Sequence, residues 1–371
     1  MYIESQKQMV LTINNADKVT ILIAGSGEVW IDWGDNTPDE IYLPYNYDYF
    51  STKDWENKSI KYAYFHTYKE SSTKTITITG ENITHLQCDN IQLTSLDVSK
   101  NKELTFLDCN KNQLTSLDVS NNIYLMDLCC SDNQLTNLDI SKNDMLIELC
   151  CYRNLLTHLD VSNNIDLEHL YCYENQLTTL NLSNNNKLYV LSCRNNMLTH
   201  LDISNNIELL SLYCSNNRLA SLDLSSSIYL DELYCYNNLL THLDVSNNTL
   251  LTELFCYNNQ LTTLDVKDNF SLLKLYCGDN RLTRLDVSKN TELIELYCND
   301  NQLNFLKINN NVTLKDIHFQ NNPLLKSEII NNPLLKLRQL GHDDNITWCV
   351  PGILLGVGDK GFVAISKGFL E

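Results

Sequence analysis

Residues 104–125 read LTFLDCNKNQLTSLDVSNNIYL, which is one copy of a 21-residue repeat followed by the first leucine of the next copy, and this repeat fills most of the chain. Cysteine recurs every 21 residues over Cys88–Cys298, and leucine recurs in the same register over Leu86–Leu296. Asparagine forms a third series over Asn112–Asn322. A fixed period in this range indicates a solenoid, in which each repeat buries its apolar side chains against its neighbours.

Two short segments of each repeat alternate in polarity, LDC at residues 107–109 and LDV at residues 117–119. Side chains alternate between the two faces of a β-strand, so the outer residues of each segment point into the coil. Stacking about 12 repeats, each ~4.8 Å above the last, predicts two columns of short strands and therefore two parallel sheets. We expect the asparagine columns that begin at Asn112 and Asn122 to bond the backbone inside the coil, where N–H groups would otherwise lack partners.

The motif L-x-x-L-x-C-x-x-N-x-L at residues 104–114 resembles the leucine-rich repeat family. The second half of the repeat, at residues 114–122, follows the same pattern, which is closest to the short bacterial class with 21 residues per repeat. The resemblance implies a mainly β protein with a leucine-rich repeat solenoid over residues 81–340. It also implies a bacterial protein that is secreted or displayed on the cell surface and takes part in adhesion or host interaction.

Residues 1–80 carry no repeat. Alternating polarity predicts short strands, separated by turn residues and by a long polar loop at 38–58; the strands are expected at residues 9–13, 19–24, 28–33, 60–65 and 74–79. Three pieces resemble the PKD-type immunoglobulin-like fold of extracellular proteins: Trp33-Gly34-Asp35-Asn36-Thr37, Phe65-His66-Thr67-Tyr68 and the strand at 74–79. We therefore expect a small β-sandwich that caps the open end of the solenoid, because a terminal repeat otherwise exposes its core.

The charge and the termini limit the classes of partner. A net charge of −19 and a pI near 4.7 argue against nucleic acid, whose phosphates require lysine and arginine. No apolar run approaches the length that spans a membrane. Met1-Tyr2-Ile3-Glu4 does not begin a signal peptide, so removal of a leader, another export route and an intracellular location all stay open. Residues 341–371 are expected to form a terminal cap of one or two strands, a disordered tail or a surface-attachment segment.

The chain has fourteen cysteines, and the repeat period accounts for the positions of eleven of them. The eleven that recur over Cys88–Cys298 alternate inward with leucine, and we expect them to act as small hydrophobes rather than as metal ligands. Cys129 and Cys150 instead take the outward position in adjacent repeats. We expect free thiols there, because parallel side-chain vectors suit a cross-repeat disulfide poorly. Cys349 stands alone in the tail, and neither a metal nor another cofactor is expected.

Catalytic patterns are absent from the sequence. His158, His200 and His242 recur on the LDV segments, but they lie two repeats apart, on the order of 9.6 Å, which is too far to share a metal. No glycine-rich phosphate loop, Ser-His-Asp set or H-E-x-x-H stretch is present. An aspartate column that includes Asp118 faces outward on the same segments. Calcium could bridge such a column, whereas the alternative is a solvated face whose carboxylates bond neighbouring serine and threonine.

The outward side of the LDC segments is where the repeats differ, so it is free to serve a partner. It carries ten aromatic residues with glutamates beside them, and an aromatic patch of this size is typical of a binding site. The expected ligand-binding residues are Tyr152, Tyr171, Tyr173, Tyr213, Tyr234, Tyr236, Phe255, Tyr257, Tyr276 and Tyr297. The sequence thus predicts a binding protein without enzymatic activity, with a protein as partner. A glycan-binding module and a structural spacer are the alternatives.

Overall fold

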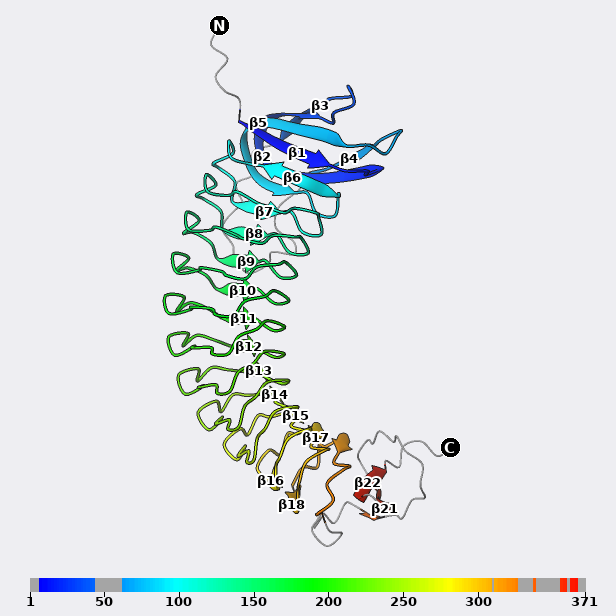
Figure 1. Cartoon of the computed structure of the whole chain (residues 1–371), viewed down its shortest axis with the longest axis vertical. Coiled ribbons are helices and arrows are strands. Elements are labelled where there is room, and N and C mark those ends of the chain that lie inside the picture. The colour runs from blue at the N-terminus through cyan, green and yellow to red at the C-terminus, as the bar shows by residue number, and fades with distance from the viewer. Residues whose placement is uncertain are drawn as a thin grey trace. The chain divides into compact units, whose positions relative to one another are not determined.

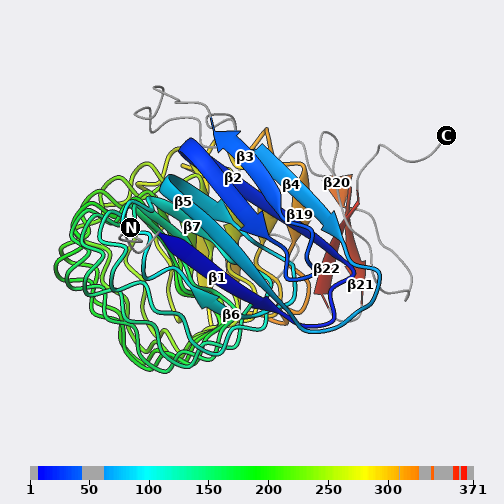
Figure 2. The same ribbon diagram turned by 90° about the horizontal axis from the view of Figure 1, so that it is seen from above.

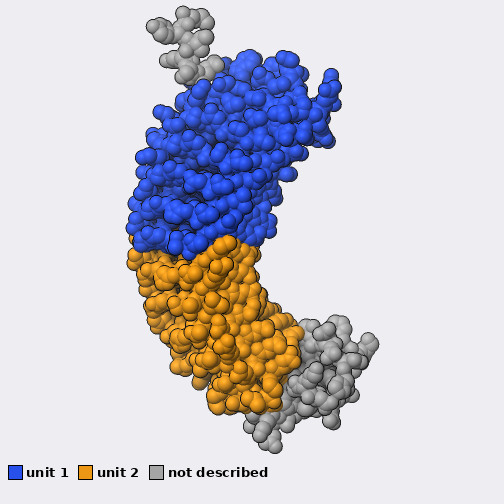
Figure 3. Space-filling model, in the orientation of Figure 1, with its two compact units in different colours: residues 1–185 blue, residues 186–371 orange. Residues whose placement is uncertain are grey.

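The computed structural model describes residues 7–43, 62–308 and 310–325, together with the backbone of short strands at 336–337, 354–358 and 361–365. It is mainly β, with about 11 turns of 21 residues. The chain divides into two compact units, residues 1–185 and residues 186–371 (Figure 3). The described part of the chain has no helix with the length and hydrophobicity that crossing a membrane requires.

The N-terminal strands are antiparallel and share partners (Figure 2). They are β1 (Gln8–Ile13), β2 (Lys18–Asp32), β3 (Asp39–Leu43), β4 (Tyr62–Thr67), β5 (Lys74–Gln87) and β6 (Leu93–Asp97). Strand β2 pairs with β3, β4 and β5, and β1 pairs with β5 and β6. Large side chains such as Met9 and Trp33 are completely buried among them.

Two of the expected strand boundaries were wrong. Segments 19–24 and 28–33 form one strand, β2, because the chain between them bulges instead of turning back. Gly25 permits the bulge, with φ of +148° and a backbone so close to Asn82 that a Cβ atom would lie 2.0 Å from its carbonyl oxygen. The predicted loop at 38–58 contains strand β3; most of the rest of that loop lies outside the described residues.

Strand β5 joins the N-terminal strands to the repeats without a linker. Its first half pairs antiparallel with β1, and its second half pairs in parallel with β7 (Phe106–Asp108), so that His85 lies opposite Phe106. The expected domain boundary at residue 80 therefore falls inside one strand.

The LDC segments form in-register columns of parallel strands within each unit (Figure 1). In unit 1, β7 is followed by β8 (Asp127–Cys129), β9 (Glu148–Cys150) and β10 (His169–Tyr171). The column of unit 2 consists of β11 (Val190–Ser192), β12 (Ser211–Tyr213), β13 (Glu232–Tyr234), β14 (Glu253–Phe255), β15 (Lys274–Tyr276), β17 (Glu295–Tyr297) and β19 (Asp316–His318). Each strand buries its central leucine or isoleucine, and all eleven cysteines of the 21-residue series are 0% exposed, which confirms their role as core residues.

The second parallel sheet, expected from the LDV segments, is mostly absent from the described residues. Parallel pairing occurs there only between β16 (Arg284–Asp286) and β18 (Phe305–Lys307). In the other repeats the segment bends after the aspartate. Asp118 Oδ1 accepts the N–H of Ser120 at 2.9 Å and closes a local turn, and Asp286 of the pairing strand β16 makes the same bond with Ser288 at 3.0 Å, so this turn is common to paired and unpaired segments.

The asparagine columns bond the backbone inside the coil, as the sequence predicts. In the first column, Asn133 donates from Nδ2 to the carbonyls of Cys109 and Cys130, at 3.0 and 3.1 Å. Its Oδ1 accepts the N–H of Leu114 at 2.9 Å, so one amide joins two repeats. In the second column, Asn164 donates to the carbonyl of Asn143 in the preceding repeat at 2.7 Å.

The last three described strands lie beyond the regular repeats. Strand β20 (Lys336–Leu337) pairs in parallel with β21 (Leu354–Gly358), which pairs antiparallel with β22 (Gly361–Ile365). The rest of the expected C-terminal segment, 341–371, lies outside the described residues, as does Cys349.

Replacing Asn133 with alanine is expected to lower the free energy of unfolding by about 2–4 kcal/mol, because it leaves a buried N–H and carbonyls without their partner. The exposed Asn121 provides a matched Asn→Ala control, which should change stability by less than about 0.5 kcal/mol. Urea unfolding of both variants measures the difference. Equal losses in the two variants would show that the amide column does not hold the repeats together.

The aspartate column makes stability sensitive to acid. Hydrogen bonds from the serine two residues further on lower the pKa of Asp118, Asp139 and Asp160. A carboxylate with a lowered folded-state pKa stabilises the fold above its unfolded pKa, near ~3.9, and that stability is lost as the pH falls through the folded value. We expect the melting temperature to hold from about pH 7 to about pH 5 and to fall below about pH 4.

A triple Asp→Asn variant at these three positions should lose less of its melting temperature in acid. The amide keeps an acceptor oxygen but does not titrate, and the chain already uses this solution where Asn181 accepts the N–H of Ser183 at 3.1 Å. Thermal melts between about pH 7 and about pH 2.5 compare the variant with the unmodified chain. The same acid loss in both chains would assign the sensitivity to other carboxylates.

Candidate ligand-binding site

Five aromatic residues of unit 2 form one outward column, called here the aromatic strip: Tyr213, Tyr234, Phe255, Tyr276 and Tyr297. Each is the last residue of its strand, and parallel pairing places each ring directly beside the next. The strip thus follows from the repeat itself, because a residue at a fixed place in the period faces the same way in every repeat.

The rings of the strip stack on one another. The centroids of Phe255 and Tyr276 are 4.2 Å apart with planes 1° from parallel, and those of Tyr276 and Tyr297 are 4.2 Å apart at 2°. The rings of Tyr213, Tyr234 and Phe255 are tilted by 43–50° at 4.3–5.0 Å. Contacts of this kind contribute roughly 0.5–1.5 kcal/mol each and fix the ring orientations.

Carboxylates hold most of the tyrosine hydroxyls. Tyr213 donates to Glu232, Tyr234 to Glu253 and Tyr276 to Glu295, in each case a carboxylate of the following repeat. The acid lies two residues before the next aromatic residue, and therefore on the same face of its strand. Ring contacts therefore fix the orientation of the rings in the strip, and charge-assisted hydrogen bonds fix most of its hydroxyls.

Burial and the bonds to the glutamates raise the pKa of Tyr234 and Tyr276. Burial and the hydrogen bond to Asp316 raise the pKa of Tyr297 to about 12. Burial alone would raise the pKa of Glu253, but hydrogen bonds from Lys274 and Tyr234 outweigh it and lower the pKa. Lys274 Nζ lies 2.8 Å from Glu253 Oε1, so this carboxylate is shared between a cation and a phenol.

The other expected site residues form smaller groups. Tyr236 and Tyr257 stack at 4.4 Å in unit 2, two residues along the chain from the strip. In unit 1, Tyr152 and Tyr173 stack at 4.3 Å. Tyr171 lies beside His169 at a centroid distance of 6.4 Å.

Sequence reasoning missed one end of the strip. His318 packs against Tyr297, with ring centroids 4.2 Å apart and planes tilted by 33°, and continues the column, while Asp316 accepts the hydroxyl of Tyr297. Adding 21 to Tyr297 gives His318, so the period contained the signal. A search restricted to phenylalanine, tyrosine and tryptophan could not find it.

All ten expected site residues are partly exposed. Their exposure is limited where neighbouring rings cover one another's faces. The strongly exposed large apolar residues of unit 2 lie elsewhere, in the bends of the repeats. Among them are Tyr229 at 46%, Leu250 at 50% and Phe270 at 56% exposure.

An open groove of about 470 Å³ lies on the aspartate side of unit 2. Its lining includes His200, His242 and the carboxylates of Asp202, Asp223 and Asp244. Each carboxylate already accepts the backbone N–H two residues further on, at 2.9–3.0 Å. One oxygen of each carboxylate is thus held by a backbone turn.

Cys129 and Cys150 carry free thiols in the structure and lie opposite one another on β8 and β9. The Cys150 thiol donates to Glu148 Oε1 at 3.3 Å. A hydrogen bond with Cys129, together with burial and Glu148, raises the pKa of Cys150. Sequence reasoning compared only a disulfide with free thiols here and did not connect Glu148, which precedes Cys150 by two residues on the same face.

No protein-family model matches the chain, and no curated protein does. Solved structures do match. The functional domain of InlJ from Listeria monocytogenes, which includes a cysteine ladder, is 36% identical with a TM-score of 0.67. That match covers 73% of this chain and 61% of the InlJ chain, so this chain spans about three fifths of the InlJ chain.

Two further structures support the same fold. The internalin InlF from Listeria monocytogenes is 25% identical with a TM-score of 0.63, and the match covers 66% of this chain and 76% of InlF. YopM from Yersinia enterocolitica is 22% identical with a TM-score of 0.53, covering 68% of this chain and 59% of YopM. This chain therefore has the leucine-rich repeat fold, with bacterial leucine-rich repeat proteins, internalins and YopM, as its structural neighbours.

Proposed function

We propose that this chain is a binding protein without enzymatic activity and that it recognises a protein partner through the aromatic strip. The observation that carries the proposal is the run of five partly exposed rings from Tyr213 to Tyr297, each in contact with the next, two pairs tilted and two pairs stacked. The other expected residues, in the pairs Tyr152–Tyr173 and Tyr236–Tyr257 and at Tyr171, are proposed as further contact points.

The strip is ordered before any partner arrives. Stacking fixes the rings, and Glu232, Glu253 and Glu295 fix three of the hydroxyls. A partner then loses little conformational freedom on the side of this protein, which favours affinity. Tyrosine also supplies large contact area with few rotatable bonds, a property common at protein-binding surfaces.

The ring orientation favours a protein partner over a glycan. A sugar is usually bound on the open face of an aromatic ring, whereas Phe255 and Tyr276 lie 1° from parallel at 4.2 Å and cover each other's faces. The carboxylates beside the rings, which would accept sugar hydroxyls, already accept tyrosine hydroxyls. Ring edges and methylene groups of glutamate remain for apolar side chains of a partner.

We also propose that the protein is secreted or displayed on the cell surface, with residues 1–80 as a PKD-like domain, 81–340 as the solenoid and 341–371 as a terminal cap. Two contacts support the PKD-like domain, because they join the segments that carry the resemblance. Tyr68 donates to the carbonyl of Trp33 at 2.8 Å, and His66 bonds Asp35 at 2.8 Å. Likeness to internalins supports an adhesive or host-directed role.

The proposed location is tested by labelling intact cells that express the chain with an antibody against unit 2. Surface display predicts labelling without permeabilisation, and secretion predicts the chain in the culture medium. Labelling that requires permeabilised cells, with no chain in the medium, would contradict both.

Replacing Tyr234, Phe255 and Tyr276 with serine is expected to weaken binding of the partner at least about tenfold, because binding energy concentrates in buried aromatic contacts. Panels of immobilised surface proteins and of glycans, probed with the purified chain, identify the ligand. The variant loses ring contacts worth roughly 0.5–1.5 kcal/mol each, so binding is measured well below its melting temperature.

The matched control replaces Tyr229, Leu250 and Phe270 with serine, three exposed apolar residues of the same unit outside the strip. This control should bind as the unmodified chain does. Equal binding by both triple variants would move the site away from the strip, capture of glycans alone would favour the glycan-binding module, and no binding to either panel would favour the spacer.

A further inference from the structure

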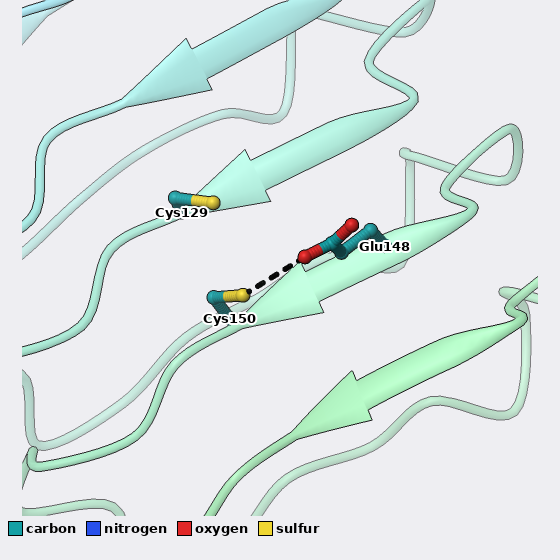
Figure 4. A group of neighbouring side chains, drawn as sticks. All are labelled: Cys129, Glu148 and Cys150. Atoms are coloured by element: carbon teal, nitrogen blue, oxygen red, sulfur yellow. Dashed lines mark hydrogen bonds between the residues drawn. The ribbon is translucent and has the colours of Figure 1, made fainter. Parts of the chain in front are cut away.

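Unit 1 carries a cluster of metal-ligating side chains on the outward face of β8 and β9 (Figure 4). One ligand atom each of Cys129, Glu148 and Cys150 lies within 4.8 Å of the other two. Parallel pairing places Cys129 opposite Cys150, and Glu148 lies two residues before Cys150 on the same face. The fold therefore brings two thiols and a carboxylate together from two adjacent strands.

The repeat does not need thiols at these two positions. The inward cysteines fill the core in every regular repeat, whereas the outward position that Cys129 and Cys150 occupy holds Asp108, Ser192 or Tyr213 elsewhere. In unit 2 the glutamate of this face bonds the tyrosine hydroxyl of the preceding repeat. Glu148 instead bonds the Cys150 thiol, and the residue of the preceding repeat is the Cys129 thiol.

We propose that Cys129, Glu148 and Cys150 bind one thiophilic divalent cation, with Zn²⁺ as the first candidate. Two thiolates and one carboxylate make a three-ligand set of the kind that zinc accepts, with the fourth tetrahedral position open to solvent. Binding releases the thiol protons to the solution. None of the three ligands belongs to the aromatic strip, so the proposed metal site is independent of the function proposed for the strip.

The dimensions suit a metal. Around a tetrahedral zinc with Zn–S of about 2.3 Å and Zn–O of about 2.1 Å, neighbouring ligand atoms lie roughly 3.6–3.8 Å apart. The Cys150 sulfur and the Glu148 oxygen are 3.3 Å apart, and all three ligand atoms lie within 4.8 Å of one another, so side-chain rotations can reach these spacings. A disulfide suits the strands less well, because their spacing of about 4.8 Å exceeds the usual Cβ–Cβ separation of about 3.8 Å.

The surroundings also favour a cation. Strand pairing places Asp127 and His169 on either side of Glu148. The Nδ1 atom of His169 is buried and makes no hydrogen bond among the described residues, so a polar atom beside the cluster lacks a partner. Water or a metal-bound solvent molecule at the open position would supply one.

Cobalt provides a direct test, because Co²⁺ substitutes for zinc and thiolate ligation gives a charge-transfer absorption. The full-length chain carrying Cys349→Ser, which removes the one thiol outside the described residues, is titrated with Co²⁺ under a non-thiol reductant. We expect the absorption to saturate at one equivalent and to disappear when Zn²⁺ is added.

Two variants assign the ligands. Replacing both Cys129 and Cys150 with serine should abolish the charge-transfer absorption. Glu148→Gln should raise the dissociation constant for Co²⁺ about tenfold or more, because loss of a direct ligand costs at least as much as loss of a supporting one. Glu208→Gln, the same change at an exposed glutamate of unit 2 that belongs to neither site, should leave it unchanged.

A second measurement keeps the proposal testable if the double variant folds poorly. In the unmodified chain, maleimide should label the partly exposed Cys129 in the absence of metal, and stoichiometric Zn²⁺ should protect it. The proposal is overturned by cobalt absorption that persists in a folded double variant, by no absorption at one equivalent, or by labelling of Cys129 that zinc does not change.

Discussion

Backbone hydrogen bonding inside the coil is the constraint on which the whole structure depends. A 21-residue turn with only three-residue strands leaves many N–H and C=O groups inside, away from water. The asparagine side chains supply the missing partners, as Asn133 does for Leu114, Cys109 and Cys130. The same position must therefore be asparagine in repeat after repeat, and this requirement sets the period as firmly as leucine burial does.

Left-handed backbone at one position explains a second preference. The residue before the first asparagine column has φ of 51–56° in successive repeats, and it is asparagine at Asn195, Asn216, Asn237 and Asn258. Asparagine tolerates this conformation better than most residues. The chain thus closes its turns with few glycines, although Lys111 adopts the same conformation at some cost.

The two halves of the repeat have different structural roles. The LDV half closes its turn with an aspartate, which fixes the outward residues and leaves little to vary. The LDC half pairs as strands, so its outward side chains are held only by their neighbours. Variation there costs the fold little, and this is where aromatic rings, acids and two extra thiols collect. The candidate sites lie on the face that the fold leaves free.

Cysteine shows how strongly position decides chemistry in this protein. Cys130 points inward, is 0% exposed and has its pKa raised by burial, so it acts as a hydrocarbon-like filler. Cys129, its neighbour in sequence, points outward and lies opposite another thiol. A single residue step along a strand changes a core group into a candidate ligand.

The sequence by itself determined the solenoid, the burial of the cysteine series and the role of the asparagine columns, because a strict period repeats every local environment. It also located the aromatic column, since equal positions in the period face the same way. Only the tertiary structure decided that the LDV segments mostly do not pair, because the alternating pattern fixes which side chains point inward and not whether neighbouring backbones come within bonding distance. It alone joined Glu148 to Cys129 and Cys150, since that contact depends on side-chain rotation across two strands rather than on spacing.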